Sequence, residues 1–271
     1  MKLFIALILL GVFSQQVFSF SDVQEKGYLR VAVYKNYAPF SFRENGQLKG
    51  IEVELGKLLA KKLGVDPIIW AIGADENMED DLRNTIWKGH YLGGGTADVM
   101  LHAPINKVFS KANDKVIFSN AYFKEETIAV RHNAHSSTPL MKAFADHKIG
   151  VELDTLPDFY LVGTMGGRFR SNVAHYRTVE EAVQALKEGE VRSVVAPRSQ
   201  IEFALGVNAD EYVFTPVSMP LSYQSTWNVG MAVKQGRQPL VDKLTVAIKE
   251  LKKSGELSEL FKKYNTSYIS P

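Results

Sequence analysis

Segments with the apolar patterns of strands and of helices alternate along nearly the whole chain of 271 residues. Residues 28–34 form a short apolar run with β-branched side chains, which predicts a strand, and residues 50–65 have apolar side chains at helical spacing. A strand at 66–72, a helix at 78–89 and a buried strand at 96–103 are expected to follow. This order predicts a parallel sheet with helices on its faces.

The second half of the chain repeats this order, although the two halves differ in sequence. Thr178 and Glu181 have the spacing of a capping box, in which Thr178 caps the helix and Glu181 reaches back to it. Helical spacing continues toward the end of the chain, with a break at Ser254 and Gly255. Helices are therefore expected at 137–147, 154–165, 178–190, 197–206 and 238–264, and strands at 148–153, 173–176, 191–197 and 225–236.

The first residues have the pattern of an export signal. Lys2 precedes an apolar run at 3–13, which is shorter than the roughly 20 residues that span a bilayer. The pattern predicts a signal peptide at 1–21, with cleavage after Ser19 or after Ser21, and a buried N-terminal helix is the alternative. The chain has no cysteine, so it has neither a disulfide framework nor the attachment point of a lipid anchor. We therefore expect a soluble protein of the periplasm.

Charge and motifs exclude several classes of function. The net charge of +2 and the absence of a basic block argue against a nucleic-acid partner. No catalytic motif is present, and His132 with His135 is too small a set to predict a metal. Glu125 and Glu126 are expected to be exposed near a chain crossing. The sequence thus predicts no enzyme, no cofactor and no metal.

The order of motifs resembles that of the family 3 solute-binding proteins, which have the type II periplasmic binding fold. The resemblance covers essentially all of the chain after the expected signal. It rests on the opening "LRVAVYKNYAPFSFRENGQLKGIEVELGKLLAKKLGV", then on "ADVML", "VIFSNAYF", "KIGVELDT", "TVEEAVQALKEGEVRSVVAPRS" and the closing "GMAVKQGRQPLVDKLTVAIKELKKSGELSELFKKY".

This resemblance implies an α/β fold with two lobes, each a mixed, mostly parallel sheet flanked by helices, joined by two crossover strands. Lobe 1 would comprise 22–126 and 219–271, and lobe 2 would comprise 127–218. A small molecule would bind in the cleft, and the lobes would close on it by a hinge motion. The partner would be an inner-membrane ABC permease, and the protein would be a monomer.

The resemblance also gives candidate ligand-binding residues. Tyr37 would stack on the ligand, and the strand end at His102 and Ala103 would offer backbone groups. Asp154 and Thr155 would present a helix N-terminus, which favours an anionic group. The full set of candidates is Asn36, Tyr37, Phe40, His102, Ala103, Lys107, Lys111, Tyr122, Asp154, Thr155 and Arg198.

Two departures from the family pattern bear on the ligand. Amino-acid binders of the family grip the α-carboxylate with an arginine after the "ADVML" strand, but this chain has no arginine between Arg83 and Arg131. They hold the α-ammonium with an acid at the end of the strand that matches "VRSVVAP", but this chain has no acid at 196–199. Lys107 and Lys111, in a lysine-rich turn, together with Arg198 therefore predict an anionic ligand, or no ligand.

Two alternatives to a transport receptor stay open. The glycine-rich loop 89–98, together with the segment before it, is similar to binding-protein relatives associated with quinoprotein alcohol dehydrogenases, which act as accessory partners. Other proteins on this fold are cyclohexadienyl dehydratases, which eliminate water from a small anion by means of an acid in the cleft. The first alternative implies a macromolecular partner, and the second implies turnover.

Overall fold

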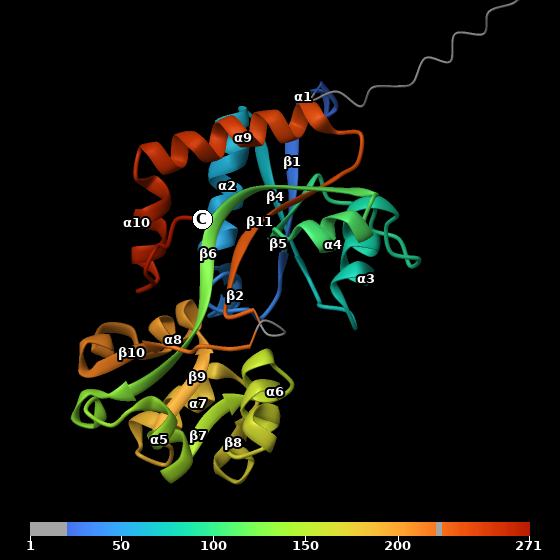
Figure 1. Ribbon diagram of the computed structural model, residues 1–271. Helices are drawn as coiled ribbons and strands as arrows, with labels where there is room; N and C mark the ends of the chain where they lie inside the picture. Colours follow the sequence, from blue (N-terminus) through green and yellow to red (C-terminus); the bar gives the residue numbers. More distant parts are fainter. Residues whose placement is uncertain (1–20, 221–223) are drawn as a thin grey trace, which may run out of the picture.

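The computed structural model describes residues 21–220 and 224–271, which form two α/β lobes (Figure 1). The expected signal peptide and its cleavage sites lie outside the described residues, apart from Ser21. In the part of the chain that is described, no helix is both long enough and apolar enough to cross a membrane.

Lobe 1 is built on strands in the order β4-β1-β5-β11-β6. β1 pairs in parallel with β4 and with β5, and β11 lies antiparallel between β5 and β6. The elements are α1 (Ser21–Lys26), β1 (Tyr28–Tyr34), β2 (Phe42–Glu44), β3 (Gln47–Lys49), α2 (Ile51–Leu63), β4 (Asp66–Ile72), α3 (Met78–Leu82), β5 (Val99–Pro104), α4 (Lys107–Ala112), β6 (Val116–His132), β11 (Thr226–Lys234), α9 (Gln238–Lys253) and α10 (Glu256–Lys263).

Lobe 2 continues the same sheet in the order β6-β9-β7-β8, with β10 on the other edge of β6. β7 pairs in parallel with β8 and β9, whereas β6 pairs antiparallel with β9 and β10. The elements are α5 (Leu140–Asp146), β7 (Ile149–Glu152), α6 (Leu156–Gly163), β8 (Val173–Tyr176), α7 (Val179–Lys187), β9 (Ser193–Pro197), α8 (Arg198–Leu205) and β10 (Tyr212–Pro216).

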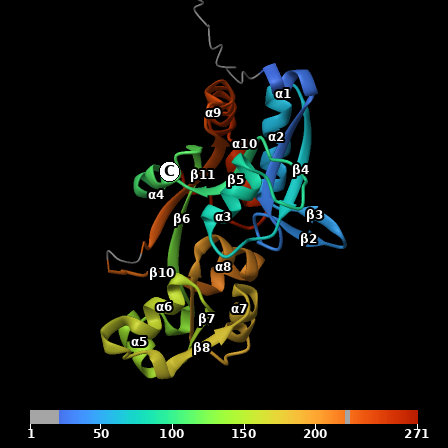
Figure 2. The same cartoon turned by 90° about the vertical axis from the view of Figure 1, so that its right-hand side faces the viewer.

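Strand β6 runs through both lobes, as Figures 1 and 2 show from two sides. It pairs with β11 as far as Glu126 and with β9 from Thr127 onward. The return connection lies beside it, because the N–H of Thr127 donates to the carbonyl of Ser225 at 2.7 Å. The predicted two-lobe α/β class is confirmed, whereas the lobe boundaries at 126/127 and 218/219 stay a prediction.

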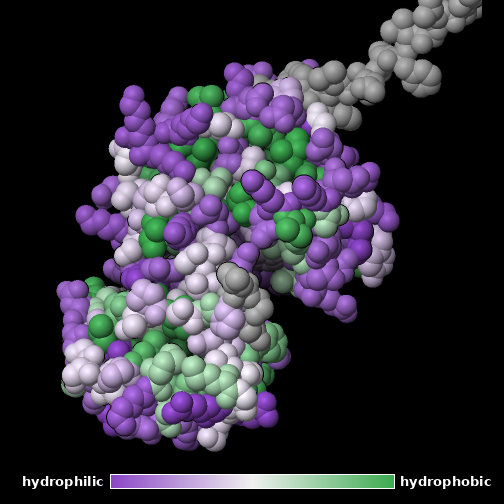
Figure 3. Space-filling model, in the orientation of Figure 1, coloured by the Kyte–Doolittle hydropathy of each residue, from purple (hydrophilic) through white to green (hydrophobic). Residues whose placement is uncertain are grey.

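Each lobe has apolar cores on both faces of its sheet. In lobe 1, Leu55 of α2 and Leu244 of α9 pack on one face, and Leu82 and Ile86 pack on the other. Lobe 2 is arranged likewise, with α7 and α8 on one face and α5 and α6 on the other. Full burial of one such leucine contributes roughly 1.5–3 kcal/mol, so these stripes fix the strands that carry the site. On the face shown in Figure 3, hydrophilic residues cover most of lobe 1, which is the upper lobe in that view.

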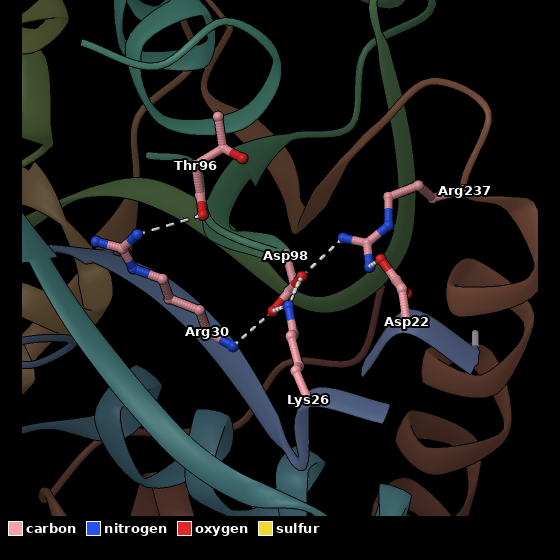
Figure 4. A network of polar contacts seen from close by, with 6 residues as sticks. All are labelled: Asp22, Lys26, Arg30, Thr96, Asp98 and Arg237. Carbon is pink, nitrogen blue, oxygen red and sulfur yellow. Dashed lines mark hydrogen bonds and ion pairs between the residues drawn. The ribbon is translucent and has the colours of Figure 1, made fainter. Parts of the chain in front are cut away.

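A network of charged side chains joins segments of lobe 1 that are far apart in the sequence (Figure 4). The buried carboxylate of Asp98 accepts from the Lys26 ammonium at 2.6 and 2.7 Å, from the backbone N–H of Arg30 at 2.8 Å and from the Arg237 guanidinium at 2.8 Å. Arg237 also pairs with Asp22. Three other segments of the chain, α1, β1 and the turn before α9, therefore converge on one carboxylate.

The chain after α10 returns to the junction of the lobes. The N–H of Ser267 donates to the Glu202 carboxylate of α8 at 2.6 Å, and the N–H of Lys124 donates to the carbonyl of Ile269 at 2.9 Å. The terminal segment thus contacts both β6 and lobe 2.

Several local predictions need correction. The helix expected at 78–89 is α3 followed by a π-helical turn at Arg83–Trp87, and the lysine-rich turn is helix α4. The helix expected from residue 137 begins at Leu140, because Pro139 occupies its N-cap. Thr178 caps α7 as predicted, but Glu181 accepts from the N–H of Arg177 rather than that of Thr178.

Candidate ligand-binding site

An aromatic group lies where lobe 1 faces lobe 2. Tyr37, in the loop after β1, stacks on Phe40 with ring centroids 5.5 Å apart. The imidazole of His102 meets both rings edge-on, at 4.7 Å from Tyr37 and 4.6 Å from Phe40. Phe40 is fully buried, whereas Tyr37 and His102 are partly exposed. Three of the predicted site residues are therefore in mutual contact.

A buried carboxylate orients the histidine. Glu52, in the first turn of α2, has no exposed surface and lies 2.7 Å through Oε1 from Nδ1 of His102. The Tyr122 hydroxyl donates to the same oxygen and accepts the backbone N–H of His102 at 3.0 Å. Burial raises the pKa of Tyr122 well above its usual value, so this hydroxyl stays a donor to Glu52. These contacts fix the imidazole between the aromatic rings.

A second acid lies at the crossing between the lobes. Glu125 was expected to be exposed, but its side chain is 2 % exposed. It accepts from the hydroxyl and the backbone N–H of Ser199, at the start of α8, and from the N–H of Glu126 at 3.0 Å. Burial raises the pKa of Glu125 to about 7. The structure therefore holds an acid between the lobes that titrates near neutral pH.

The surroundings of Tyr37 are acidic. Burial raises the pKa of Tyr37, and the carboxylates of Glu125, Glu52 and Glu152 raise it further. Glu152 ends β7 of lobe 2, and Gln200 of α8 forms a side-chain hydrogen bond with Tyr37. Residues of both lobes thus meet at this tyrosine, and most of the charges among them are negative.

The backbone is unusual at three predicted residues. Asn36, His102 and Asp154 have φ values of 57°, 60° and 61°, in the left-handed region that residues other than glycine seldom adopt. Asn36 and Asp154 each follow the end of a strand, and His102 lies within β5 near its end. Such conformations gather at functional sites, where the surrounding structure stabilises them.

The three cations that were expected to bind the ligand, Lys107, Lys111 and Arg198, lie outside the aromatic group of Tyr37, Phe40 and His102. Lys107 and Lys111 are exposed on α4. Arg198 pairs with Glu126 and Glu202, and its guanidinium lies 5.4 Å from the centre of the Phe214 ring. The charge of Arg198 is therefore balanced within the protein.

The remaining candidates lie at the ends of strands. Ala103 is fully buried and pairs with Gly230 of β11. The hydroxyl of Thr155 donates to the carbonyl of Glu152 at 2.7 Å, and the N–H of Asp154 donates to Asp158. Thr155 stands at the N-cap of α6, as predicted, but its side chain makes no capping bond.

The sequence did not single out Glu52, Ser199 or Gln200, and it predicted that Glu125 is exposed. A signal for Glu125 was present in β6, because Phe123 and Ala129, which share its face of the strand, are apolar. The period of two places Glu125 on the side of apolar neighbours. Nothing comparable marks Ser199 and Gln200, whose positions depend on how α8 follows β9.

The raised pKa of Glu125 predicts a pH-dependent stability. Its ordinary value of 4.5 rises to about 7 on folding, so its contribution to stability is complete below pH 4.5 and is lost as the pH rises through 7. The Glu125→Gln variant should gain stability relative to wild type between pH 5 and pH 8, by at most about 3 kcal/mol. Urea unfolding at both pH values measures this difference.

The matched control is Glu76→Gln, which changes an exposed acid in the same lobe. Its stability relative to wild type should be the same at pH 5 and pH 8. Equal behaviour of the two variants would contradict the account of Glu125.

In the described ranges, no three histidines, aspartates or glutamates are grouped so that they could hold a metal. The rings of His132 and His135 lie 6.4 Å apart, and the guanidinium of Arg192 lies 2.5 Å from Nε2 of His135. A metal cation at His135 would meet that positive charge.

Comparisons with known proteins agree with the fold. The L-cystine-binding protein TcyJ of Escherichia coli (strain K12) is 27 % identical over 265 residues, which cover 93 % of this chain and 90 % of the relative. A probable histidine-binding protein of Campylobacter jejuni is 25 % identical over 240 residues, with coverages of 87 % and 84 %. Both relatives are named as binding proteins.

A solved structure of an ancestral cationic amino acid solute-binding protein superposes with a TM-score of 0.70, at 21 % identity, over 91 % of this chain and 99 % of that one. At this identity the likeness concerns the fold. The model of the bacterial extracellular solute-binding proteins, family 3, matches residues 29–87 and 91–267, and the gap touches the start of the glycine-rich loop. The chain belongs to family 3 of the bacterial extracellular solute-binding proteins.

Proposed function

We propose that this protein captures, between its lobes, a small polar solute that carries a positively charged nitrogen, such as an amino acid or an amine. The observation that carries the proposal is the buried Glu125 carboxyl, which forms no ion pair among the described residues. A buried carboxylate is strongly stabilised by an ammonium or guanidinium partner. The aromatic ring of Tyr37, which rests on the buried ring of Phe40, would pack on the apolar part of the ligand.

The acidic surroundings favour a cation over the anion that the sequence suggested. Glu52, Glu125 and Glu152 all act on Tyr37, whereas Arg198 is paired with acids. The relatives named as cystine-binding and histidine-binding proteins take ligands that contain an ammonium group. Lys107 and Lys111 could still meet the carboxylate of an amino acid when the lobes close.

Transport is the cellular role that fits this capture. The proposal places the protein in the periplasm after removal of residues 1–19 or 1–21, where it would deliver its solute to an ABC permease. The lobes would close about the crossing at 126–127, and the protein would act as a monomer without turnover.

Calorimetric titration of residues 22–271 tests the proposal. The panel comprises arginine, histidine, cystine and a diamine, with small carboxylates, sulfonates and phosphates as anionic competitors. We expect binding of one or more of the nitrogen cations and a loss of about 10–100-fold in affinity in Glu125→Gln, because a charged hydrogen bond contributes about 1.5–3 kcal/mol. Glu76→Gln should bind as wild type does.

The pH dependence provides a second readout. The ligand needs Glu125 ionised, so affinity should rise about tenfold between pH 6 and pH 8 in wild type and stay level in Glu125→Gln. Binding of an anion that Glu125→Gln leaves unchanged would overturn the proposal, and so would chemical turnover of a ligand.

A second candidate is an accessory role beside a larger partner, such as a periplasmic quinoprotein dehydrogenase. It is favoured by the loop at 89–98, where Tyr91 is 88 % exposed and Leu92 is 78 % exposed. This role predicts no small-molecule binding in the panel, together with retention of the partner by the wild-type protein and its loss in a Tyr91→Ser, Leu92→Ser variant.

A further inference from the structure

A pocket of about 470 Å³ opens on lobe 1 next to lobe 2. It lies between the hairpin β2–β3, helix α2, the end of α10 and helix α8. None of its lining residues belongs to the group formed by Tyr37, His102 and Glu125, so it is a separate place in the molecule. Its volume falls within the range of about 300–1,000 Å³ that is usual for small-molecule sites.

Aromatic side chains from both lobes line this pocket. The Phe42 ring of lobe 1 lies 5.2 Å from the Phe203 ring of lobe 2 and 6.1 Å from the Tyr264 ring, between ring centres. The plane of the Phe42 ring makes an angle of 56° with that of Phe203 and of 86° with that of Tyr264. The walls therefore include both ring faces and ring edges. Such walls accommodate a flat ring by offset or edge-to-face packing.

The charges of the pocket leave one cation available. The Glu44 carboxylate pairs with Lys49 at 2.5 Å, and the Glu54 carboxylate pairs with Lys263 at 2.6 Å. Glu54 also accepts from the Tyr264 hydroxyl at 2.8 Å. Lys57 lines the pocket from α2 and forms no ion pair or hydrogen bond in the described part of the chain. Lys49 and Lys263 therefore balance the two acids, and Lys57, which also helps to lower the pKa of Glu54, makes the net charge of the lining positive.

We propose that this pocket binds a small aromatic anion, with its ring packed against both Phe42 and Phe203 and its carboxylate on the ammonium of Lys57. Because Phe203 belongs to lobe 2 and the other walls belong to lobe 1, the bound ring would link the two lobes. Occupancy would thereby favour the arrangement of the lobes in which Phe42 and Phe203 are in contact, and binding in the two sites would be coupled in both directions.

Fluorine NMR titration of residues 22–271 with 4-fluorobenzoate tests this site, with 4-fluorobenzamide as the uncharged probe of the same shape. We expect saturable binding of the benzoate, with a dissociation constant of about 1 mM, as is typical of a fragment of this size. The amide should bind at least fivefold more weakly. Lys57→Gln and Phe203→Leu should each weaken benzoate binding by at least fivefold.

Two matched variants separate this site from other sources of binding. Lys61→Gln removes a lysine one turn further along α2, outside the pocket, and should leave benzoate binding unchanged. Glu76→Gln removes an exposed acid elsewhere in lobe 1, outside the pocket, and should also leave it unchanged. No saturable binding up to about ten times the expected dissociation constant, equal binding of the amide, or full binding in Lys57→Gln would overturn the proposal.

Discussion

Replacing Gly50 with alanine is expected to lower the free energy of unfolding by about 3–5 kcal/mol, through backbone strain and overpacking together. Gly50 has a φ of 132°, and a Cβ built on it would lie 2.2 Å from the carbonyl oxygen of Phe40. That approach cannot relax locally, because the N–H groups of Ile51 and Glu52 donate to the carbonyls of Pro39 and Phe40 at 3.0 and 2.9 Å. Urea unfolding at pH 7 measures the change.

Gly64→Ala is the matched control for this substitution. Gly64 also has a positive φ, 72°, at the end of the same helix, but a Cβ there would meet nothing within 4 Å. It should cost about 1–2 kcal/mol, the usual penalty for a left-handed residue. Gly50→Ala should in addition weaken ligand binding, since it displaces the loop that carries Tyr37 and Phe40. Equal losses in the two variants would contradict this account.

Replacing Asp98 with asparagine should cost about 3–5 kcal/mol of stability, the range found when one partner of a buried ion pair is removed. The carboxylate is 4 % exposed and faces Lys26 and Arg237. The Arg237 side chain is 9 % exposed and would keep Asp22 as a partner, but water cannot replace the carboxylate that it loses. The midpoint of urea unfolding should fall while its slope stays constant, because the surface exposed on unfolding is the same.

Asp114→Asn provides the comparison for Asp98. Its side chain is 78 % exposed and lies 3.7 Å from the Lys115 ammonium, so its removal should change stability by less than about 0.5 kcal/mol. An Asp98→Asn variant that unfolds at the same urea concentration as Asp114→Asn would show that the network in Figure 4 contributes little.

The fold was predictable because its strands and helices follow apolar periodicity. The strands expected at 28–34 and 66–72 have the observed bounds, and the motif order gave the two lobes. The sequence did not predict the hairpin β2–β3, which is three residues per strand, or the length of β6. Strand β6 continues without a break through Glu125 and Glu126, although glutamate has a low strand propensity. Its pairing with β11 and β9 overrides that propensity.

The places of the aromatic candidates were predictable, whereas their part in ligand binding stays a prediction. Tyr37, Phe40, His102 and Tyr122 come from motifs that fix their places, and they lie together. The places of the charged residues were not predictable in the same way. They depend on which side chains are buried and which ion pairs form, and neighbouring residues in the sequence do not determine either. Arg198 was expected to face a ligand, but it lies beside Glu126 and Glu202, and the acid that does lie between the lobes was expected at the surface.

The place of β11 in the sheet has a consequence for the order in which a nascent chain can fold. β11 is the strand between β5 and β6, yet it follows all of lobe 2 in the sequence. Lobe 2 is made of consecutive residues and can complete its sheet first. Until residues 226–234 have been synthesised, β5 and β6 lack the strand that joins them, and the core around Met231 and Val233 stays open to water. The lobe that carries the N-terminus can therefore complete its sheet only after lobe 2 has been synthesised.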